Sequence, residues 1–265
     1  MRKRIFTPNS KKKIPINLLY LLAFLFYLCL PSFIFAQIES LTLFTGSQLG
    51  TYFSVGNTVK EIIEKENPKF QILCEPSNGS LANARLIESN KADLAIMQSD
   101  IAYYLSTGTR IFSLPSDRIN GICSLYSEAI HIVVKKTSGI KTIKDLKGKI
   151  ISVGLRKSGS EFNTRIVLDT LDITYQDIVP MYENSDSSIK LLEKNRIDAF
   201  FVTTKVPAPY LIKSFEELNL ALISFKPSEL EKIIKAYPYF VSKVIAANSY
   251  ANQLEEVSTL GLELY

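Results

Sequence analysis

The stretch Asn90-Lys91-Ala92-Asp93-Leu94-Ala95-Ile96-Met97 is repeated in pattern by Asn195-Arg196-Ile197-Asp198-Ala199-Phe200-Phe201-Val202. Each stretch places an aspartate before an apolar, strand-like run. Each also follows a glycine-bearing loop, because Gly46 lies 47 residues before Asp93 and Gly154 lies 44 residues before Asp198. An aspartate before a strand is common in α/β chains, but the shared order and spacing predict two similar α/β lobes.

Strand-like and helix-like segments alternate around both stretches. Leu41–Thr45 is a short apolar run, and apolar residues then recur at helical spacing from Tyr52 to Ile63. The second copy repeats this order, with a strand at Ile150–Val153 and a helix from Phe162 to Leu171. Such alternation predicts an α/β fold with a largely parallel sheet.

An extended stretch, Ile119–Lys136, lies between the two copies. It shows no helical periodicity and has too few glycines and prolines for a flexible linker. We expect a strand that crosses from one lobe into the other. Two lobes joined in this way form a central cleft, and clefts between domains are favoured ligand sites.

The N-terminal segment has the pattern of an export signal. Six Lys and Arg residues lie in the first 13 positions, followed by the apolar run Ile16–Leu30 and then by Ala36. A basic start, an apolar run and a small residue at the cut are typical of a secretory signal peptide, here residues 1–36, and predict a periplasmic protein. An uncleaved membrane anchor is the alternative, because about 20 apolar residues can span a bilayer.

The charge of the remaining chain argues against nucleic acid as a partner. The whole sequence has 31 basic and 26 acidic side chains, a net charge of +5. Without the six cations of residues 1–36, 25 basic and 26 acidic side chains remain, so the basic excess belongs to the export signal. A nearly neutral body has little electrostatic attraction for a phosphate backbone.

Three loops place predicted helix N-termini where a small anion could bind. They are Gly46–Tyr52, Asn78–Ser80 and Gly154–Glu161. Unpaired N–H groups and the helix dipole attract anions at such positions. The alternative is that glycine is present in these loops only because a tight turn requires it.

The loop Gly154–Glu161 is similar to a phosphate-binding loop but has Ser160 in place of the required lysine, which argues against nucleotide hydrolysis. Ser158 and Glu161 have the spacing of a capping box, in which both side chains stabilise the start of a helix. For Ser160 and Asn163, contact with a ligand and a purely local role both stay open.

The sequence offers little for catalysis. His131 is the only histidine and lies in the apolar crossing stretch, where a structural role is favoured over acid–base chemistry. No Cys and His cluster has the spacing of a metal site, and no G-x-S-x-G elbow is present. An envelope serine hydrolase that uses a cleft serine with His131 remains an alternative, because triad partners can be distant in sequence.

Two cysteines, Cys74 and Cys123, lie in the body of the chain. Export to an oxidising compartment would permit a disulfide between them. Each lies in an apolar stretch, however, where lone cysteines are commonly buried as small hydrophobic residues. Two buried free thiols are therefore the favoured prediction.

The loops and the repeated stretches also carry a family resemblance. The chain resembles the TAXI-type solute-binding proteins of tripartite ATP-independent periplasmic (TRAP) transporters, from about Leu41 to about Leu260. The motifs that carry the resemblance are Thr45–Gly56, Ser77–Asn83, Ala92–Asp100, Ser124–Glu128, Ser152–Gly154, Ser158–Arg165 and Asp198–Thr203. Any one of them is weak, and their common order along the chain makes the resemblance specific.

The resemblance implies a two-lobed class II periplasmic-binding fold that closes on a small organic anion, such as glutamate or another carboxylate. Such a protein is a monomer, needs no cofactor or metal, catalyses nothing and delivers its ligand to the membrane subunits of a TRAP permease. Gln98 and Asn163 would orient the ligand through their amides. The cleft residues implied in this way are Ser47, Thr51, Tyr52, Asn78, Ser80, Gln98, Ser99, Tyr126, Ser160, Glu161, Asn163 and Thr203.

The resemblance also divides the chain into lobes. It implies that residues 37–128 and 226–265 form the first lobe and that residues 129–225 form the second. TAXI-type proteins continue beyond the position of Tyr265 with segments that complete the first lobe. A C-terminally truncated relative that no longer binds a ligand is therefore a further alternative to a working receptor.

Overall fold

The structure is a computed structural model that describes Asn17, Tyr20 and residues 38–264. Residues from Ile38 onward form one compact unit, separate from Met1–Gln37. The predicted signal peptide, residues 1–36, lies outside the described residues apart from Asn17 and Tyr20. Among the helices described, none combines the length and the apolar character needed to cross a membrane.

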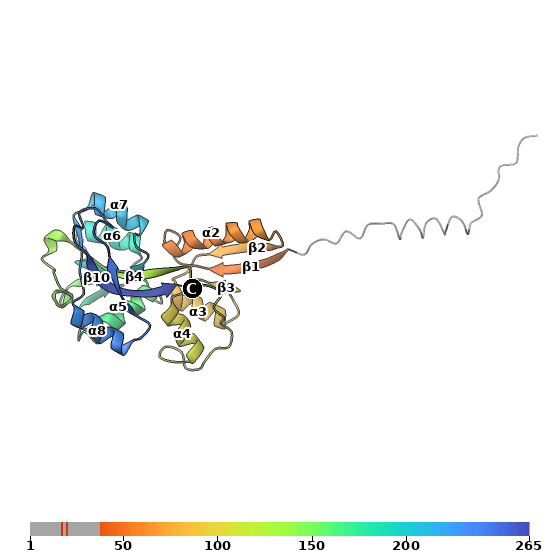
Figure 1. The fold of residues 1–265 in the computed structure, drawn as a ribbon, viewed down its shortest axis with the longest axis horizontal. Coiled ribbons are helices and arrows are strands. Elements are labelled where there is room, and N and C mark those ends of the chain that lie inside the picture. Colours follow the sequence, from red (N-terminus) through yellow and green to blue (C-terminus); the bar gives the residue numbers. More distant parts are fainter. Residues whose placement is uncertain (1–16, 18–19, 21–37, 265) are drawn as a thin grey trace, which may run out of the picture. The chain divides into compact units, whose positions relative to one another are not determined.

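The first lobe is built on a three-stranded parallel sheet with helices on both faces (Figure 1). Its strands are β1 (Glu39–Phe44), β2 (Phe70–Glu75) and β3 (Leu94–Ala95), in the order β2-β1-β3. Helix α2 (Thr51–Glu66) lies on one face, and α3 (Ser80–Glu88) and α4 (Ser99–Thr107) lie on the other. Leu43, Ile72 and Ile96 form the centre of its small apolar core.

The second lobe is built on a seven-stranded mixed sheet in the part of the chain that the structure describes. Its strand order is β6-β5-β7-β4-β10-β9, and β8 also pairs with β4. The strands are β4 (Tyr126–Lys135), β5 (Ile150–Ser152), β6 (Val179–Met181), β7 (Ala199–Thr204), β8 (Leu220–Leu222), β9 (Val241–Ile245) and β10 (Val257–Leu264). The helices are α5 (Gly159–Thr170), α6 (Ser185–Glu193), α7 (Pro209–Glu217) and α8 (Pro227–Ala236), with 3-10 turns at Lys136–Ser138 and Ile143–Leu146.

The two lobes repeat one unit, as the sequence predicts. The parallel order β2-β1-β3 in the first lobe corresponds to the parallel order β6-β5-β7 in the second. The two aspartates of the repeated stretches make the same contact. Asp93 Oδ2 accepts a hydrogen bond from Thr42 N–H at 2.8 Å, and Asp198 Oδ2 accepts one from Ile150 N–H at 2.8 Å.

The asparagines that begin the repeated stretches are also equivalent. Asn90 and Asn195 follow α3 and α6 and have φ angles of 54° and 55°, in the left-handed region that asparagine tolerates better than most residues. Each therefore turns the chain from a helix toward the strand that follows the next aspartate, β3 or β7. The predicted two-lobed α/β fold is confirmed.

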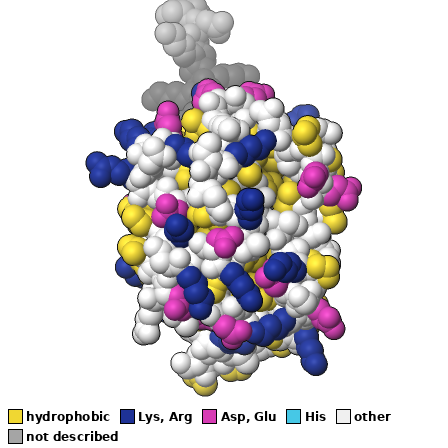
Figure 2. All heavy atoms as spheres, turned by 90° about the vertical axis from the view of Figure 1, so that its left-hand side faces the viewer, with side chains coloured by type: hydrophobic (Ala, Val, Ile, Leu, Met, Phe, Trp, Pro, Cys, Tyr) yellow, Lys and Arg dark blue, Asp and Glu magenta, His cyan; other side chains and the backbone are white. Residues whose placement is uncertain are grey.

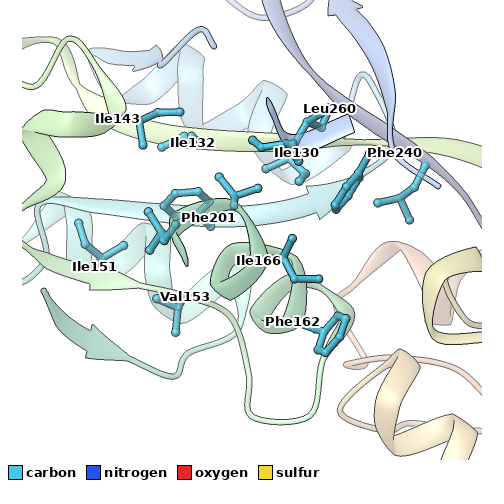
Figure 3. Close-up of a cluster of buried hydrophobic side chains, with 14 of the residues drawn as sticks. Ile130, Ile132, Ile143, Ile151, Val153, Phe162, Ile166, Phe201, Phe240 and Leu260 are labelled. Atoms are coloured by element: carbon cyan, nitrogen blue, oxygen red, sulfur yellow. The ribbon is translucent and has the colours of Figure 1, made fainter. Parts of the chain in front are cut away.

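Strand β4 organises the interior of the second lobe because its side chains alternate between two apolar cores. Ile130 and Ile132 face one core, together with Phe201 of β7 and Leu260 of β10 (Figure 3). Val133 faces the other core. Every residue from Glu128 to Val134 is buried, so this strand is held from both faces and from its neighbours in the sheet.

The crossing segment is shorter than the sequence predicts. Within Ile119–Lys136, strand pairing begins only at Tyr126. The preceding residues 119–125 form no strand, and the side chain of Ile122 is 79% exposed. Cys123 is also exposed and Cys74 is half-buried. The prediction that both thiols are free is therefore confirmed, and the prediction that both are buried is wrong.

The C-terminal segment extends the second sheet. Residues 226–265, which the resemblance assigns to the first lobe, contribute α8, β9 and β10. Strand β10 pairs with β4, Leu262 lying opposite Glu128, and β9 pairs with β10. The structure therefore places these elements with the second lobe, because β10 completes the hydrogen bonding along the edge of β4.

Charges of both signs are mixed on the surface of the second lobe. On the face in Figure 2, Lys and Arg side chains lie between Asp and Glu side chains. Lys232 and Asp172, for example, form an exposed pair at 2.9 Å. This mixed face agrees with the nearly neutral charge of the chain beyond residue 36.

We expect Asp198→Ala to destabilise the protein by about 1 kcal/mol or more, because Ile150 N–H loses its acceptor. Asp93→Ala should have a similar or smaller effect, since Asp93 is the more exposed of the two. Denaturant unfolding followed by circular dichroism measures both changes. Asp117→Ala, at an exposed position, is the control and should change stability by less than about 0.5 kcal/mol. Three equal stabilities would contradict the role assigned to the repeated aspartate.

Candidate functional site

A cavity of about 100 Å³ lies between the two lobes. It is formed at the carboxyl ends of parallel strands in both lobes, where α/β folds place their ligand sites. The first lobe lines it with Gly46, Ser47, Gly50, Thr51, Tyr52, Asn78, Gly79, Ser80 and Gln98. The second lobe and β4 line it with Glu128, Gly154, Leu155, Ser158, Gly159, Ser160, Glu183, Asn184, Ser185, Phe201, Val202, Thr203, Thr204 and Tyr210.

Five helices begin at this cavity. The residues that precede α2, α3, α4, α5 and α6 all line it, and they are Gly50, Gly79, Gln98, Ser158 and Asn184. The first N–H groups of a helix have no partner within the helix, and the helix dipole makes this end positive. The cavity is therefore surrounded by hydrogen-bond donors of the main chain.

The two lobes differ in how many of these donors are already used. In the second lobe, Ser158 Oγ accepts from Glu161 N–H at 3.1 Å, and Asn184 Oδ1 accepts from Ser187 N–H at 2.8 Å. In the first lobe, α2 and α3 follow glycines, which have no side chain to make such a bond. The positive helix ends that remain open to a ligand thus belong mainly to the first lobe.

The lobes touch across the cavity, so the cleft is closed. Asn163 Nδ2 donates to Gln98 Oε1 at 3.2 Å, and the Ala82 N–H donates to the Lys157 carbonyl oxygen at 3.2 Å. Gly159 lies against Gln98 so closely that a Cβ there would be 1.8 Å from Gln98 Oε1. A side chain at position 159 would therefore hold the lobes apart or displace the amide.

Glu128 is the most unusual group at the cavity. Its side chain is fully buried, and Oε2 accepts from Tyr52 Oη and from Gln98 Nε2, each at 3.1 Å. Burial raises the pKa of Glu128 to about 8; the two hydrogen bonds oppose this shift, and the nearby Asp100 carboxyl adds to it. Glu128 is therefore protonated at neutral pH when the cleft is empty.

Eight of the twelve residues expected in the cleft line this one cavity. They are Ser47, Thr51, Tyr52, Asn78, Ser80, Gln98, Ser160 and Thr203. Several of them are also bonded to one another, since Ser80 Oγ accepts from Gln98 N–H at 3.1 Å and Ser160 Oγ accepts from Thr203 N–H at 3.0 Å. The structure thus brings together residues from five separate motifs of the sequence.

The other four expected residues lie outside the cavity lining. Glu161 pairs with Arg165 and accepts from Tyr175 Oη at 3.2 Å, so its carboxylate is directed to its own helix. Asn163 is fully buried behind the wall, where it holds Gln98 and Thr203. Ser99 follows the cavity residue Gln98 as the first residue of α4, and Tyr126 packs against the core of the first lobe.

Sequence reasoning did not select Glu128, Tyr210 or Asn184 as site residues. A signal for Glu128 was present, because a lone acid at the start of an otherwise apolar strand is costly unless it has a partner or a function. Asn184 precedes a helix and has the residue type of an N-cap. Nothing local marks Tyr210, which reaches the cavity only because α7 packs beside β8 and shares an apolar core with β7.

His131 does not line the cavity. It is buried in β4, where Nε2 lies 2.8 Å from Tyr250 Oη and Nδ1 lies 3.0 Å from the Ala129 carbonyl oxygen. Burial lowers the pKa of His131 to about 4, so the ring is neutral at physiological pH. With both ring nitrogens engaged in this way, His131 has the structural role that the sequence favours, and the hydrolase alternative loses its general base.

A family model described as the NMT1-like family matches residues 43–265. Solved structures with related folds include an alkanesulfonate-binding protein from Xanthomonas axonopodis pv. citri bound to MOPS (16% identity, 70% of this chain and 60% of that chain, TM-score 0.48). The periplasmic aliphatic sulphonate-binding protein of Escherichia coli is similar too (16% identity, 83% of this chain and 64% of that chain, TM-score 0.46). A protein from Bordetella bronchiseptica RB50 is also similar (14% identity, 84% of this chain and 64% of that chain, TM-score 0.50).

These structural likenesses concern the fold alone. The chain spans 60% of the length of the Xanthomonas protein and 64% of the lengths of the other two. The ligands of those proteins are therefore not assigned to this chain.

We expect Gly159→Ala to impair closure, because Gln98 is held by Glu128 and Asn163 and cannot move without breaking those bonds. The variant should still fold, since alanine favours the helix that begins at residue 159. Small-angle X-ray scattering should show a larger radius of gyration than for the parent. Gly121→Ala is the control, because a Cβ at that position meets open space. An unchanged scattering profile for Gly159→Ala would contradict the closed contact.

We expect Glu128 to make stability depend on pH. The folded protein keeps this proton up to about pH 8, whereas the unfolded chain releases it near the ordinary pKa of 4.5. The contribution of Glu128 to the free energy of unfolding is therefore full below about pH 4.5 and is lost as pH rises to about 8. Glu128→Gln should remove this loss of stability at high pH. The free energy of unfolding of the variant should therefore rise relative to that of the parent as pH increases from about 4.5 to about 8.

Denaturant unfolding at pH values from 4.5 to 8.5 measures the difference between parent and variant. Asp100, with a pKa raised by burial to about 7, has the same sign of effect but is present in both proteins. Glu216→Gln, at an exposed position, is the matched control and should leave the pH profile unchanged. Parallel profiles for the parent and Glu128→Gln would show that Glu128 is ionised in the folded protein.

Proposed function

The chain belongs to the NMT1-like family, and we propose that it is an extracytoplasmic solute-binding receptor that captures a small carboxylate-bearing ligand between its lobes. One observation carries this proposal: a cavity at which five helices begin, between two lobes joined by paired strands. In this proposal the protein binds and releases its ligand and catalyses no reaction.

The proposal requires that the cleft open. Strands β4 and β10 are the segments at which the two lobes meet (Figure 1), and they pair with each other from Tyr126 to Ala129. A change of angle at these strands would separate Gln98 from Asn163 and Thr51 from Thr204, whose hydroxyl oxygens are 3.3 Å apart. Water can replace these two polar contacts when the cleft opens. The apolar packing of Tyr104 of α4 against Phe162 of α5 and Tyr239 would also have to rearrange.

The carboxylate of the ligand is expected at the N-termini of α2 and α3. Both helices begin at residues that line the cavity and have no side-chain cap, although the Ala82 N–H of α3 already donates to the Lys157 carbonyl oxygen. Among the described residues that line the cavity, none is Lys, Arg or His, so main-chain donors and hydroxyl groups would hold the anion. The volume of about 100 Å³ favours a small ligand over a large one.

The partner and the location follow from the sequence motifs. The resemblance to TAXI-type proteins supports a glutamate-like or other carboxylate ligand and delivery to the membrane subunits of a TRAP permease. The basic and apolar segment at residues 1–36 supports export to the periplasm. In this proposal a monomer carries the ligand, since both halves of the cavity come from one chain.

A thermal-shift screen of amino acids, 2-oxo acids and dicarboxylates tests the proposal. At about 100 times its Kd, a ligand should raise Tm by about 5–10 °C. Tyr52→Phe should reduce this shift, because the lost hydroxyl supports Glu128 and Ser80 at the cavity. Tyr103→Phe removes the same group from an exposed tyrosine of α4 and should keep the full shift. A cooperative melt with no stabiliser in the panel would argue strongly against a receptor.

A further inference from the structure

One oxygen of Glu128 is buried at the cavity without a partner. Both bonds described above reach Oε2, from Tyr52 and Gln98. Within residues 38–264, Oε1 has no hydrogen-bond partner, although the side chain is fully buried and lines the cavity. A buried polar atom left unpaired costs free energy, so an arrangement of this kind indicates a partner that arrives with the ligand.

The protein itself supplies no counter-charge for this carboxyl. No Lys, Arg or His side chain of the described residues forms an ion pair with Glu128. Lys243 of β9 is the cation that acts on it most, but its ammonium group is held by Ser127, at 2.6 Å from Oγ and 3.2 Å from the carbonyl oxygen. A cation that pairs with Glu128 must therefore enter through the cavity.

Positive and negative charges lie at different parts of the cavity lining. The open N-termini of α2 and α3 are positive, whereas the acidic side chains of the lining are Glu128 and Glu183. A ligand with only negative charge would match the helix ends but could pair with Glu128 only while that carboxyl keeps its proton. A zwitterion, with a carboxylate and an ammonium group, would match both.

We infer that Glu128 Oε1 binds a cationic nitrogen of the ligand, so that the receptor selects amino acids over carboxylates that lack an amino group. The inference rests on the proposed function and narrows its ligand class. The carboxylate lies at the N-termini of α2 and α3, and the ammonium group donates to Glu128. Glu128 is then the residue that determines specificity for the amino group.

Binding of an ammonium group at this position releases a proton. With a pKa of about 8, Glu128 is protonated in the empty cleft at neutral pH. The ammonium group displaces that proton to solvent and pairs with the carboxylate that remains. Affinity should therefore rise with pH up to about 8. For an anion, the neutral carboxyl would instead donate its own proton in a hydrogen bond, and affinity would fall above pH 8.

The other titratable groups near Glu128 do not reverse the expected rise of affinity with pH. Burial raises the pKa values of Tyr52, Tyr126 and Tyr210, so these side chains stay neutral; the pKa of Tyr210 reaches about 12. The Asp100 carboxyl of α4, as it ionises near pH 7, raises the pKa of Glu128 further, and the Lys243 ammonium lowers it. These groups are Tyr52 of α2, Asp100 of α4, Tyr126 of β4, Tyr210 of α7 and Lys243 of β9.

Calorimetry on the parent protein tests the inference with matched pairs of ligands. L-Glutamate, L-alanine and L-leucine are each compared with the 2-hydroxy acid of the same side chain, which replaces the ammonium group by a hydroxyl. We expect at least one amino acid to bind about tenfold or more tightly than its partner. Titrations at pH 7 in two buffers of different ionisation enthalpy should show release of about one proton per amino acid bound.

The variant Glu128→Gln keeps the shape of the side chain and removes its charge. It should weaken binding of the amino acid about tenfold and change binding of the hydroxy acid by less than about threefold. Proton release should also disappear. Glu216→Gln is the matched control and should behave as the parent does, since Glu216 is exposed on α7.

The outcomes separate this inference from the proposed function. Equal or tighter binding of the hydroxy acids, or uptake of a proton on binding, overturns the role of Glu128 and leaves a carboxylate receptor. Binding of neither series by the folded parent protein overturns both. Because the buffer experiment uses the parent, a variant that fails to fold does not remove the test.

Discussion

The pairing of β4 with β7, β8 and β10 is the constraint on which the rest of the structure depends. Side chains of a strand alternate between its two faces, so the register of β4 directs Ile130 and Ile132 into one core and His131 and Val133 into the other. A slip by one residue would exchange these faces. The same register sets Glu128 at the end of the strand that meets the cavity. The hydrophobic packing of the second lobe thus compensates for holding a buried carboxyl group at the cavity.

The repeated unit explains why the two lobes present similar edges to each other. In each lobe an aspartate accepts a hydrogen bond from the central strand, and an asparagine with positive φ turns the chain into the strand that follows the aspartate. Loops at the carboxyl ends of these strands then lead into helices whose N-termini point to the same space. The lobes are equivalent in topology but not in chemistry. Ser158 and Asn184 use donors of the second lobe for local caps, whereas the glycines before α2 and α3 leave donors free.

The electrostatic character of the cavity therefore comes from backbone orientation and from buried acids. Charges on the surface lie in water, where their effect is screened within about 10 Å. Helix ends and a carboxyl group inside a closed cleft are screened far less. This difference makes Glu128 and the helix ends more informative about the ligand than the net charge of +5, which belongs to residues 1–36.

The sequence by itself determined the two α/β units, the loops that feed the helices, the capping role of Ser158, and eight of the residues that line the cavity. These features depend on local spacing, which a single chain displays directly. Only the tertiary structure decided that residues 226–264 extend the second sheet, that Asn163 supports the wall from behind, and that Tyr210 reaches the cavity. It alone showed that Oε1 of Glu128 is buried without a partner. Burial and hydrogen-bond satisfaction depend on atoms contributed by segments far apart in sequence, so no local pattern contains them.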